Sequence, residues 1–300
     1  MFMHEDTYTA YIMNSYQYLP QHEPSLDDIR SGSKLEKNPE SLKLLLSLVD
    51  LTSLNTDDTG TRVRSMCEKI NHFPNRYPGY PLLKAICVFP LLVPVVKANL
   101  KVKEVNIASV AGGFPSSQTF TEIKRRESRM AMKAGANEID MVMATGKFLE
   151  NELDYVSGEI RQIKQTVGAV KLKVILETGL LPDAEAIYRA SMVCIESGAD
   201  FIKTSTGKIQ PSATPEAVLV MCHAIRAFAE KSGRRVGIKP AGGIITATQA
   251  LDYAAIVKGV LGEEWLDPGL FRIGASRLAN NLLSEIASME TGKPQALDYF

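Results

Sequence analysis

The 300-residue sequence lacks an excess of charge of either sign. Lysine and arginine together number 34, and aspartate and glutamate also number 34, so the formal net charge is zero. Nucleic acids and anionic membrane surfaces are usually bound through a net positive field or a basic patch. The composition therefore argues against both partners and favours a small molecule, whose anionic groups would be recognised by local cations and backbone amides.

Cysteine and histidine are scarce, with four of each. Neither the Cys-x-x-Cys spacing nor a cysteine–histidine group of zinc spacing occurs, so no metal is expected. The glycine-rich segments lack the Gly-x-Gly-x-x-Gly spacing, and a nicotinamide cofactor is therefore not indicated. We predict that the cysteines are reduced thiols of the core and that the histidines are scattered surface or core residues: Cys67, Cys87, Cys194 and Cys222; His4, His22, His72 and His223.

Long hydrophobic runs are also missing. No uncharged apolar stretch reaches the length of a membrane-spanning helix. The first residues include His4, Glu5 and Asp6 in place of the basic and apolar regions of a secretory signal. A cytoplasmic location is therefore expected.

What the chain does contain is a repeat of short apolar segments that end in small or polar residues. Continuous apolarity is typical of strands covered on both faces, as in parallel sheets. Strands are predicted at 45–52, 84–90, 105–113, 138–144, 172–178, 201–205, 236–243 and 271–276. Amphipathic helices are predicted between them at 119–134, 153–167, 183–197 and 215–231. A spacing of about thirty residues suits β/α units, eight of which close an α/β TIM (β/α)8 barrel.

The two ends of the chain do not follow this repeat. Residues 44–288 are assigned to the barrel, preceded by an extension, residues 1–43, that is expected to form a capping helix or a loose arm. Residues 289–300 form a polar C-terminal tail that ends in Tyr299 and Phe300. Aromatic residues at the end of a polar tail predict docking, either on the barrel mouth or on a neighbouring subunit.

Two lysines, Lys203 and Lys239, stand where predicted strands run into turns. An ammonium in an apolar strand is costly, so such a lysine is usually paired, uncharged or chemically employed. Burial and a second cation together can keep one lysine uncharged at neutral pH, which makes it a nucleophile that forms a Schiff base with a carbonyl. The alternative is that both ammonium groups reach water. Asp140, inside another apolar strand, must be paired, and the two lysines are suitable partners.

Glycine loops follow the last two predicted strands, where barrels commonly bind phosphate because glycine amides can approach an oxyanion closely. A threonine hydroxyl and a lysine after the sixth strand add a donor and a cation. Glu177 could orient a lysine or accept hydrogen bonds from loop amides, and the second role is favoured. The predicted phosphate ligands are Thr206, Gly207, Lys208, Gly242, Gly243, Gly274 and Ser276.

These segments resemble those of the deoxyribose-phosphate aldolase family. The resemblance covers residues 44–280 and rests on ADFIKTSTGK at 199–208 and GIKPAGG at 237–243, supported by 49–55, 138–140, 176–179 and 271–276. It implies a TIM barrel without metal or organic cofactor. The implied reaction is the reversible cleavage of 2-deoxy-D-ribose 5-phosphate to acetaldehyde and D-glyceraldehyde 3-phosphate. The protein is expected to form a homodimer or a homotetramer.

The same resemblance implies roles for individual residues. Lys203 would be the Schiff-base lysine, Lys239 the second lysine that keeps it unprotonated and assists proton transfer, and Asp140 the acid/base group acting through water. The substrate end of the pocket would be lined by Asp50, Thr52 and Asn55, and the phosphate held by Lys208, Gly242, Gly243, Gly274 and Ser276. Arg277 stands where many relatives carry a second serine, and Tyr299 is the counterpart of a tyrosine that reaches into the site of some relatives.

Two other functions remain open at this point. One is another Schiff-base aldolase for sugar phosphates or keto acids, which would use ketone or carboxylate donors. The other is a barrel that binds a sugar phosphate without catalysis, since fold alone does not establish function. Release of acetaldehyde from deoxyribose 5-phosphate would distinguish the three.

Overall fold

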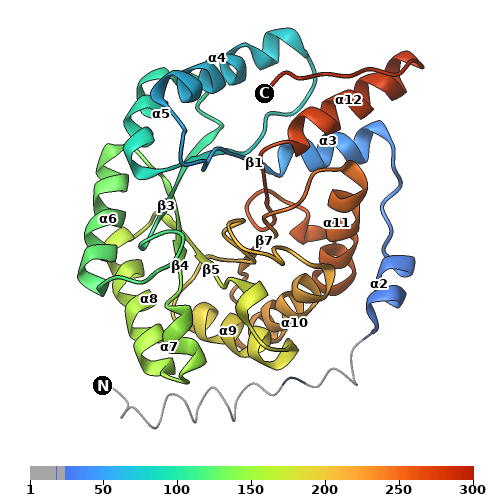
Figure 1. Ribbon diagram of the computed structural model, residues 1–300. Coiled ribbons are helices and arrows are strands. Elements are labelled where there is room, and N and C mark those ends of the chain that lie inside the picture. Colours follow the sequence, from blue (N-terminus) through green and yellow to red (C-terminus); the bar gives the residue numbers. More distant parts are fainter. Residues whose placement is uncertain (1–17, 19–23) are drawn as a thin grey trace.

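The structure, a computed structural model, describes Tyr18 and residues 24–300. Parallel strands form the centre of this part of the chain, and helices surround them (Figure 1). The strands are β1 Val49–Thr52, β2 Ala85–Val88, β3 Asn106–Ala111, β4 Glu138–Val142, β5 Lys171–Ile175, β6 Phe201–Lys203, β7 Gly237–Lys239 and β8 Ile273–Ala275. Strands and helices alternate along the chain, so the predicted TIM barrel is confirmed.

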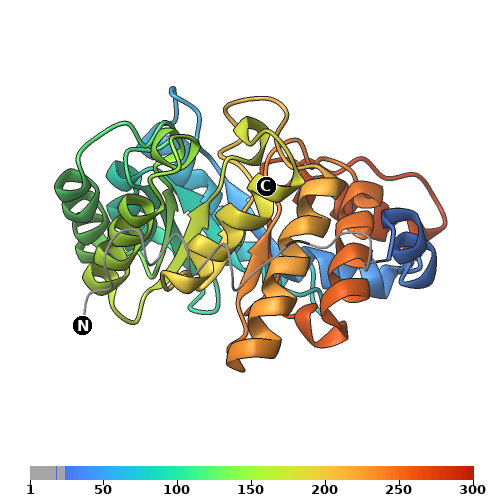
Figure 2. The same ribbon diagram turned by 90° about the horizontal axis from the view of Figure 1, so that it is seen from below.

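Each strand of the sheet pairs with its sequence neighbours, in the order β7-β6-β5-β4-β3-β2-β1-β8. The first and last strands of this order meet through isolated bridges that join Ile238 to Phe271 and Ala241 to Gly274. Backbone hydrogen bonds support the seam, including Arg272 N to Ile238 O at 3.0 Å and Gly274 N to Pro240 O at 2.9 Å. The eight strands therefore form a nearly closed barrel. Figure 2 shows this barrel from the side, with loops from its carboxyl-terminal end along the upper edge.

Six of the eleven described α-helices begin after a residue whose side chain caps them. Asp183 accepts a hydrogen bond from Ala186 N, Thr214 from Ala217 N and Thr246 from Gln249 N, each at the start of a helix. The helices are α2 Leu26–Gly32, α3 Pro39–Ser47, α4 Gly60–Arg76, α5 Val93–Asn99, α6 Thr121–Ala134, α7 Thr145–Leu149, α8 Leu153–Val167, α9 Ala184–Glu196, α10 Pro215–Ser232, α11 Ala247–Leu261 and α12 Leu278–Thr291. Short 3₁₀ turns lie at η2 Pro90–Leu92, η3 Thr178–Leu180 and η4 Glu263–Trp265.

The first predicted strand, 45–52, was too long. Residues up to Ser47 belong to α3, which starts after the N-cap Asn38 with Pro39 at its first position, and β1 begins only at Val49. A continuous apolar run such as Leu44-Leu45-Leu46 does not distinguish a buried helix from a buried strand. This helix also crosses the expected boundary between residues 43 and 44, and its Leu42 is fully buried.

The described parts of the N-terminal extension and of the C-terminal tail lie outside the ring of strands. Most of the extension, residues 1–17 and 19–23, lies outside the described residues; α2 and α3 pack against α11 and α12 (Figure 1). At the other end, α12 continues to Thr291, three residues into the predicted tail. In the described part of the chain no helix is long and apolar enough to cross a membrane.

The tail is docked on α12 by its own backbone. Asn280 Oδ1 accepts hydrogen bonds from Tyr299 N and Phe300 N, and Ser284 Oγ accepts one from Leu297 N. The rings of Tyr299 and Phe300 pack on Phe73 of α4. The tail therefore docks on the outer ring of helices, between α4 and α12, and its predicted docking on the barrel mouth is wrong.

Candidate active site

The register of the sheet places the two predicted lysines side by side. Lys203 on β6 pairs with Lys239 on β7, and Ile175 on β5 pairs with Lys203 on the other side. Both lysines are buried, with exposed fractions of 3% for Lys203 and 0% for Lys239. The alternative in which both ammonium groups reach water is therefore wrong.

Asp140 on β4 joins the two lysines. Its Oδ2 lies 3.0 Å from Lys203 Nζ and 2.8 Å from Lys239 Nζ. Its Oδ1 accepts a third ammonium hydrogen bond, from Lys173 Nζ at 2.7 Å. The expected pairing of Asp140 with both lysines is confirmed. Lys173 is an additional cation on this carboxylate that the sequence did not predict.

These contacts fix the protonation states of the groups around Lys203. Burial acts to raise the pKa of Asp140, but Lys173, Lys239 and Lys203 outweigh it and hold that pKa well below its usual range. Burial likewise acts to lower the pKa of Lys239, and the carboxylates of Asp140 and Asp50 outweigh it, so the pKa of Lys239 is raised. Asp140 is thus an anion and Lys239 a cation at neutral pH.

Three further charged residues, for which the sequence predicted no role, fill the barrel below the lysines. Lys173 Nζ lies 2.6 Å from Glu138 Oε2. Arg272, immediately before β8 and fully buried, places Nη2 2.8 Å from Glu138 Oε1 and Nη1 2.7 Å from Asp50 Oδ1. The sequence did contain a signal for these buried charges. Glu138 and Asp140 stand two residues apart in an apolar strand, so both side chains must lie on the same face of the sheet and need cationic partners there.

Asp50, expected to line the substrate end of the pocket, lies below it instead. Its side chain is fully buried, and its Oδ2 is 2.5 Å from Lys239 Nζ. Burial acts to raise the pKa of Asp50, but Lys239 and Arg272 outweigh it. They lower that pKa below its usual value and keep the carboxylate ionised. Asp50 is positioned to act on Lys239, because strand β1 directs this residue into the barrel core.

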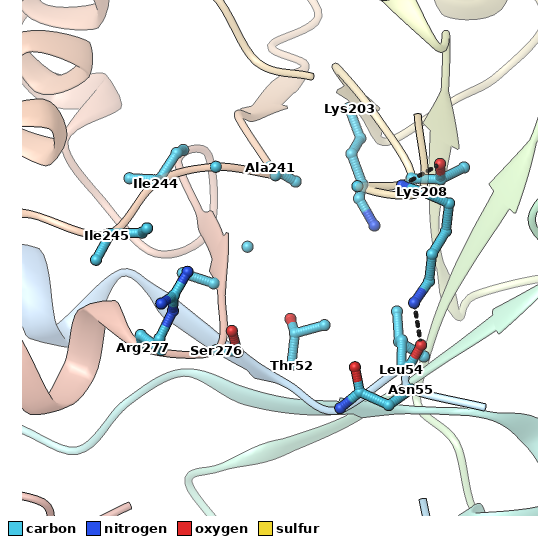
Figure 3. A pocket seen from close by; sticks show the side chains of 16 residues that line it. Thr52, Leu54, Asn55, Lys203, Lys208, Ala241, Ile244, Ile245, Ser276 and Arg277 are labelled. Atoms are coloured by element: carbon cyan, nitrogen blue, oxygen red, sulfur yellow. Dashed lines mark hydrogen bonds between the residues drawn. The ribbon is translucent and has the colours of Figure 1, made fainter. Parts of the chain in front are cut away.

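Above these charges a pocket of about 190 Å³ opens among the loops at the carboxyl-terminal end of the barrel. Lys203 extends into this pocket (Figure 3). Ten predicted site residues line it: Thr52, Asn55, Lys203, Thr206, Gly207, Lys208, Gly242, Gly243, Gly274 and Ser276. Segments far apart in the sequence thus meet around one lysine.

Glycine is required at two positions of the pocket wall. Gly242 has a φ of +89°, and a Cβ there would lie 2.6 Å from Ser212 Cβ. A Cβ on Gly274 would lie 2.8 Å from Ala241 Cβ and 3.1 Å from Lys239 Cε. The seam between β7 and β8 therefore exposes backbone to the pocket where side chains cannot fit.

The loop after β6 is held by Glu177, which follows β5. Glu177 Oε1 accepts a hydrogen bond from Thr206 N at 3.1 Å and Oε2 one from Thr206 Oγ1 at 2.5 Å. The favoured role of Glu177, accepting from a loop amide, is confirmed. Lys208 donates from Nζ to the carbonyl oxygen of Leu54 across the pocket (Figure 3).

Arg277 and Tyr299, the two residues whose roles the resemblance left open, have different locations. Arg277 lines the pocket beside Ser276, immediately before α12 (Figure 3). Tyr299 does not reach the pocket: its hydroxyl donates to the carbonyl oxygen of Lys69 in α4 at 2.8 Å. The hydrogen bonds of the tail to α12 hold Tyr299 on the outer ring.

The described residues include no group of three or more histidine, cysteine, aspartate or glutamate side chains arranged to hold a metal ion. All four cysteines are free and buried, as predicted. Cys87 on β2 is the one whose electrostatic partners include Lys203, and burial raises the pKa of its thiol to about 11.

An eight-stranded barrel whose carboxyl-terminal end holds two buried lysines around one carboxylate defines the class of protein, a TIM-barrel enzyme with a lysine-based site. Residues 44–264 match the DeoC/LacD family of aldolases. The chain belongs to this family and is an aldolase.

Curated relatives and solved structures agree with this assignment. The chain is 39% identical over 280 residues to the human deoxyribose-phosphate aldolase, covering 89% of this chain and 88% of that protein. It is 42% identical over 251 residues to a putative deoxyribose-phosphate aldolase of Caenorhabditis elegans, covering 82% of each. A crystal structure of a putative deoxyribose-phosphate aldolase from Coccidioides immitis superimposes with a TM-score of 0.71 at 25% identity, covering 95% of this chain and 96% of that chain.

Proposed function

We propose that this aldolase cleaves 2-deoxy-D-ribose 5-phosphate to acetaldehyde and D-glyceraldehyde 3-phosphate through a Schiff base on Lys203. The observation that carries the proposal is the position of Lys203: its side chain extends into the pocket while its Nζ contacts Asp140, which also binds Lys239. The names of the human and nematode relatives support the choice of substrate.

The proposed reaction begins when uncharged Lys203 attacks the C1 carbonyl of the open-chain sugar. The resulting carbinolamine takes up one proton from solvent water and loses water, which gives a protonated imine. Lys239, which stays cationic, hydrogen-bonds the departing hydroxyl. The proton of the C3 hydroxyl then passes through water to Asp140 as the C2–C3 bond breaks, which releases glyceraldehyde 3-phosphate. The electron pair of that bond forms an enamine, which regains a proton at C2; hydrolysis then frees acetaldehyde and Lys203.

The phosphate would bind opposite the reacting carbon, at the seam between β7 and β8. There the pocket is lined by Gly242, Gly243, Gly274 and Ser276. These residues have no side chain or a small one, so a phosphate could approach their backbone amides. Ser276 and Arg277 also immediately precede α12, a helix of 14 residues, and the N-terminus of a helix favours an anion. Lys208 and Arg277 add the positive charge that a phosphate dianion needs.

A sugar phosphate is the substrate class to which this pocket is best suited, but the donor must be tested. Another Schiff-base aldolase would use the same lysine with a ketone or a carboxylate donor. Acetaldehyde production from deoxyribose 5-phosphate, with no turnover of pyruvate or dihydroxyacetone phosphate as donors, is the expected result. The converse pattern would keep the lysine chemistry and overturn the substrate.

The location and assembly of the protein stay predictions. We expect the enzyme in the cytoplasm, as a homodimer or homotetramer; the aldolase of Aeropyrum pernix, which superimposes with a TM-score of 0.65 at 25% identity and covers 89% of this chain and 99% of that chain, is described as a tetramer. Light scattering of the purified protein would give the mass of the assembly.

Borohydride trapping tests the chemistry itself. Incubation with acetaldehyde or deoxyribose 5-phosphate and borohydride should add mass to the peptide that contains Lys203, because reduction converts an imine to a stable amine. Lys203→Met should show no such adduct. An adduct found on Lys239 alone would contradict the assignment of the nucleophile.

A further inference from the structure

Six buried charges form a closed ring inside the barrel. Arg272 binds Asp50 at 2.7 Å, Asp50 binds Lys239 at 2.5 Å, and Lys239 binds Asp140 at 2.8 Å. Asp140 then binds Lys173 at 2.7 Å, Lys173 binds Glu138 at 2.6 Å, and Glu138 returns to Arg272 at 2.8 Å. Positive and negative groups alternate around this ring, and all six side chains are between 0% and 1% exposed.

The ring is electrically balanced without Lys203. Its three carboxylates are matched by three cations, and each member contacts two neighbours of opposite sign. Lys203 is outside the ring and contacts it through Asp140 Oδ2 at 3.0 Å. A proton on Lys203 therefore adds an uncompensated positive charge to a buried cluster that is otherwise neutral, whereas an uncharged Lys203 leaves it balanced.

We propose that the ring as a whole, through Arg272 and Glu138 as well as Lys239, sets the pH at which Lys203 becomes an uncharged nucleophile. This inference rests on the proposed Schiff-base function. Arg272 and Glu138 are positioning residues in it: they act on Lys203 through the charge and geometry of Asp50, Lys239, Lys173 and Asp140.

The other groups near Lys203 do not replace the ring in this role. The charged and titratable neighbours come from every side: Cys87 on β2, Glu138 and Asp140 on β4, Lys173 on β5, Lys239 on β7, Asp50 on β1, Arg272 before β8, and Lys208 in the pocket. Burial raises the pKa of the Cys87 thiol to about 11, so the thiol is neutral at physiological pH. Lys208 is held by the carbonyl oxygen of Leu54.

The ring hypothesis predicts shifts of opposite sign for opposite charge changes. Glu138→Gln removes one negative charge, so the ring becomes net positive and Lys203 should lose its proton at lower pH. Arg272→Met removes one positive charge, so the ring becomes net negative and Lys203 should keep its proton to higher pH. The pH midpoint of borohydride trapping by acetaldehyde at Lys203 should move by about one pH unit in each direction.

Two further variants separate charge from structure. Glu138→Gln combined with Arg272→Met restores a neutral ring and should return the midpoint close to that of the parent. Arg272→Lys keeps the charge and should leave the midpoint unchanged. If Arg272→Met does not fold, Lys173→Met removes a positive charge at another position of the ring and should give the same alkaline shift.

A matched control lies outside the barrel. Lys124 on α6 and Glu159 on α8 form an ion pair at 2.8 Å, and both side chains are 1% exposed. Glu159→Gln is thus the same substitution in an equally buried pair, and it should leave the midpoint unchanged even where it lowers stability.

The possible failures are distinct. No adduct at Lys203 in the parent would overturn the proposed function and this inference with it. An adduct in the parent, with midpoints that stay at the parent's value in Glu138→Gln, Arg272→Met and Lys173→Met, would overturn the ring hypothesis alone. Shifts of the same sign in all folded variants would also overturn it, because loosening of the structure has no reason to follow charge.

Discussion

The floor and the rim of the pocket are built in opposite ways. The floor consists of the seven buried charges Asp50, Glu138, Asp140, Lys173, Lys203, Lys239 and Arg272, whose side chains hold one another at distances of 2.5 to 3.0 Å. The rim, residues 206–208, 242–245 and 274–277, is largely glycine, small side chains and exposed backbone.

This contrast indicates that the floor and the rim serve different steps, the chemical step and substrate binding. Breaking a buried ion pair leaves a charge without a partner, so a change at the floor affects protonation, and with it the chemical step. The proposed contacts of the rim with a phosphate would be the same in the ground state and the transition state, so a change there should affect binding. Variants of the floor should therefore alter kcat and its pH dependence, and variants of the rim should alter KM.

The largest expected effect is that of Lys239→Leu. Loss of the Lys239 ammonium leaves Asp50 and Asp140 with excess negative charge, and this charge holds the proton on Lys203. We expect kcat for deoxyribose 5-phosphate to fall by about 10³-fold at neutral pH and to recover partly at alkaline pH. The pH–rate profile of purified enzyme gives the measurement.

Lys208→Leu is the matched control for this experiment, because it removes a lysine from the rim. Its KM should rise while its pH profile stays that of the parent. If Lys239→Leu kept the profile of the parent, Lys239 would have only a structural or phosphate-binding role.

The next effect concerns stability in acid. Because the pKa of folded Asp140 is lowered, its contribution to stability is complete above the unfolded pKa and is lost as the pH falls toward the folded pKa. Asp140→Asn should cost about 3–5 kcal/mol of unfolding free energy at pH 7, since it leaves buried lysines unpaired. The deficit should stay constant down to about pH 4 and shrink below it, because the unfolded carboxyl of the parent then binds protons.

Urea unfolding between pH 3 and 7 would measure this difference. Glu290→Gln is a suitable control: Glu290 binds Lys43 at the surface, with 38% of its side chain exposed, and should contribute less than about 1 kcal/mol. A deficit for Asp140→Asn that grew as the pH fell toward 3 would contradict the depressed pKa of Asp140.

The rim is tested by Ser276→Ala. A hydrogen bond to a charged group is worth about 1.5–3 kcal/mol, so KM for deoxyribose 5-phosphate should rise by roughly tenfold to a hundredfold while kcat changes little. Free deoxyribose, which has no phosphate, serves as the internal control and should be cleaved as by the parent. Equal losses on both substrates would show that the loop supports the barrel and does not bind phosphate.

The sequence predicted which rim residues and strand-end lysines gather at one end of the barrel, because their signals are local. Glycine pairs after strands, and lysines at strand ends, are visible in a few consecutive residues, and the barrel then brings all strand ends together. The ring was not predicted, because it depends on which strands are neighbours and in what register: Asp140 meets Lys173 because β4 pairs with β5 at that residue.

The partners of Arg272 were also not predictable from the local sequence. Arg272 lies two residues before Gly274 in the predicted eighth strand, yet its partners, Asp50 and Glu138, are more than a hundred residues away in the chain. Only the pairing of β1 with β8 in the sheet brings Arg272 to Asp50. The boundary of β1 was missed for a different reason, since an apolar run before a strand is equally compatible with a helix.

The smallest expected effect separates the tail from both parts of the pocket. The sequence predicted that the tail docks on the barrel mouth or on a neighbouring subunit. The structure instead places the Tyr299 hydroxyl on the carbonyl oxygen of Lys69, on the outer helices. Tyr299→Phe should therefore lower the unfolding free energy by about 0.5–1.5 kcal/mol, the value of one hydrogen bond. The kcat should stay within about twofold of the parent, because no contact of the pocket is removed.

Asn280→Ala extends this test, because Asn280 binds the backbone of Tyr299 and Phe300 and does not line the pocket. It should lower the melting temperature and leave kcat and KM nearly unchanged. A fall of kcat by about a hundredfold in Tyr299→Phe, with stability intact, would instead mean that the hydroxyl reaches the reacting atoms during turnover. The tail would then belong to the chemistry of the floor, and the separation of floor, rim and outer ring would have to be redrawn.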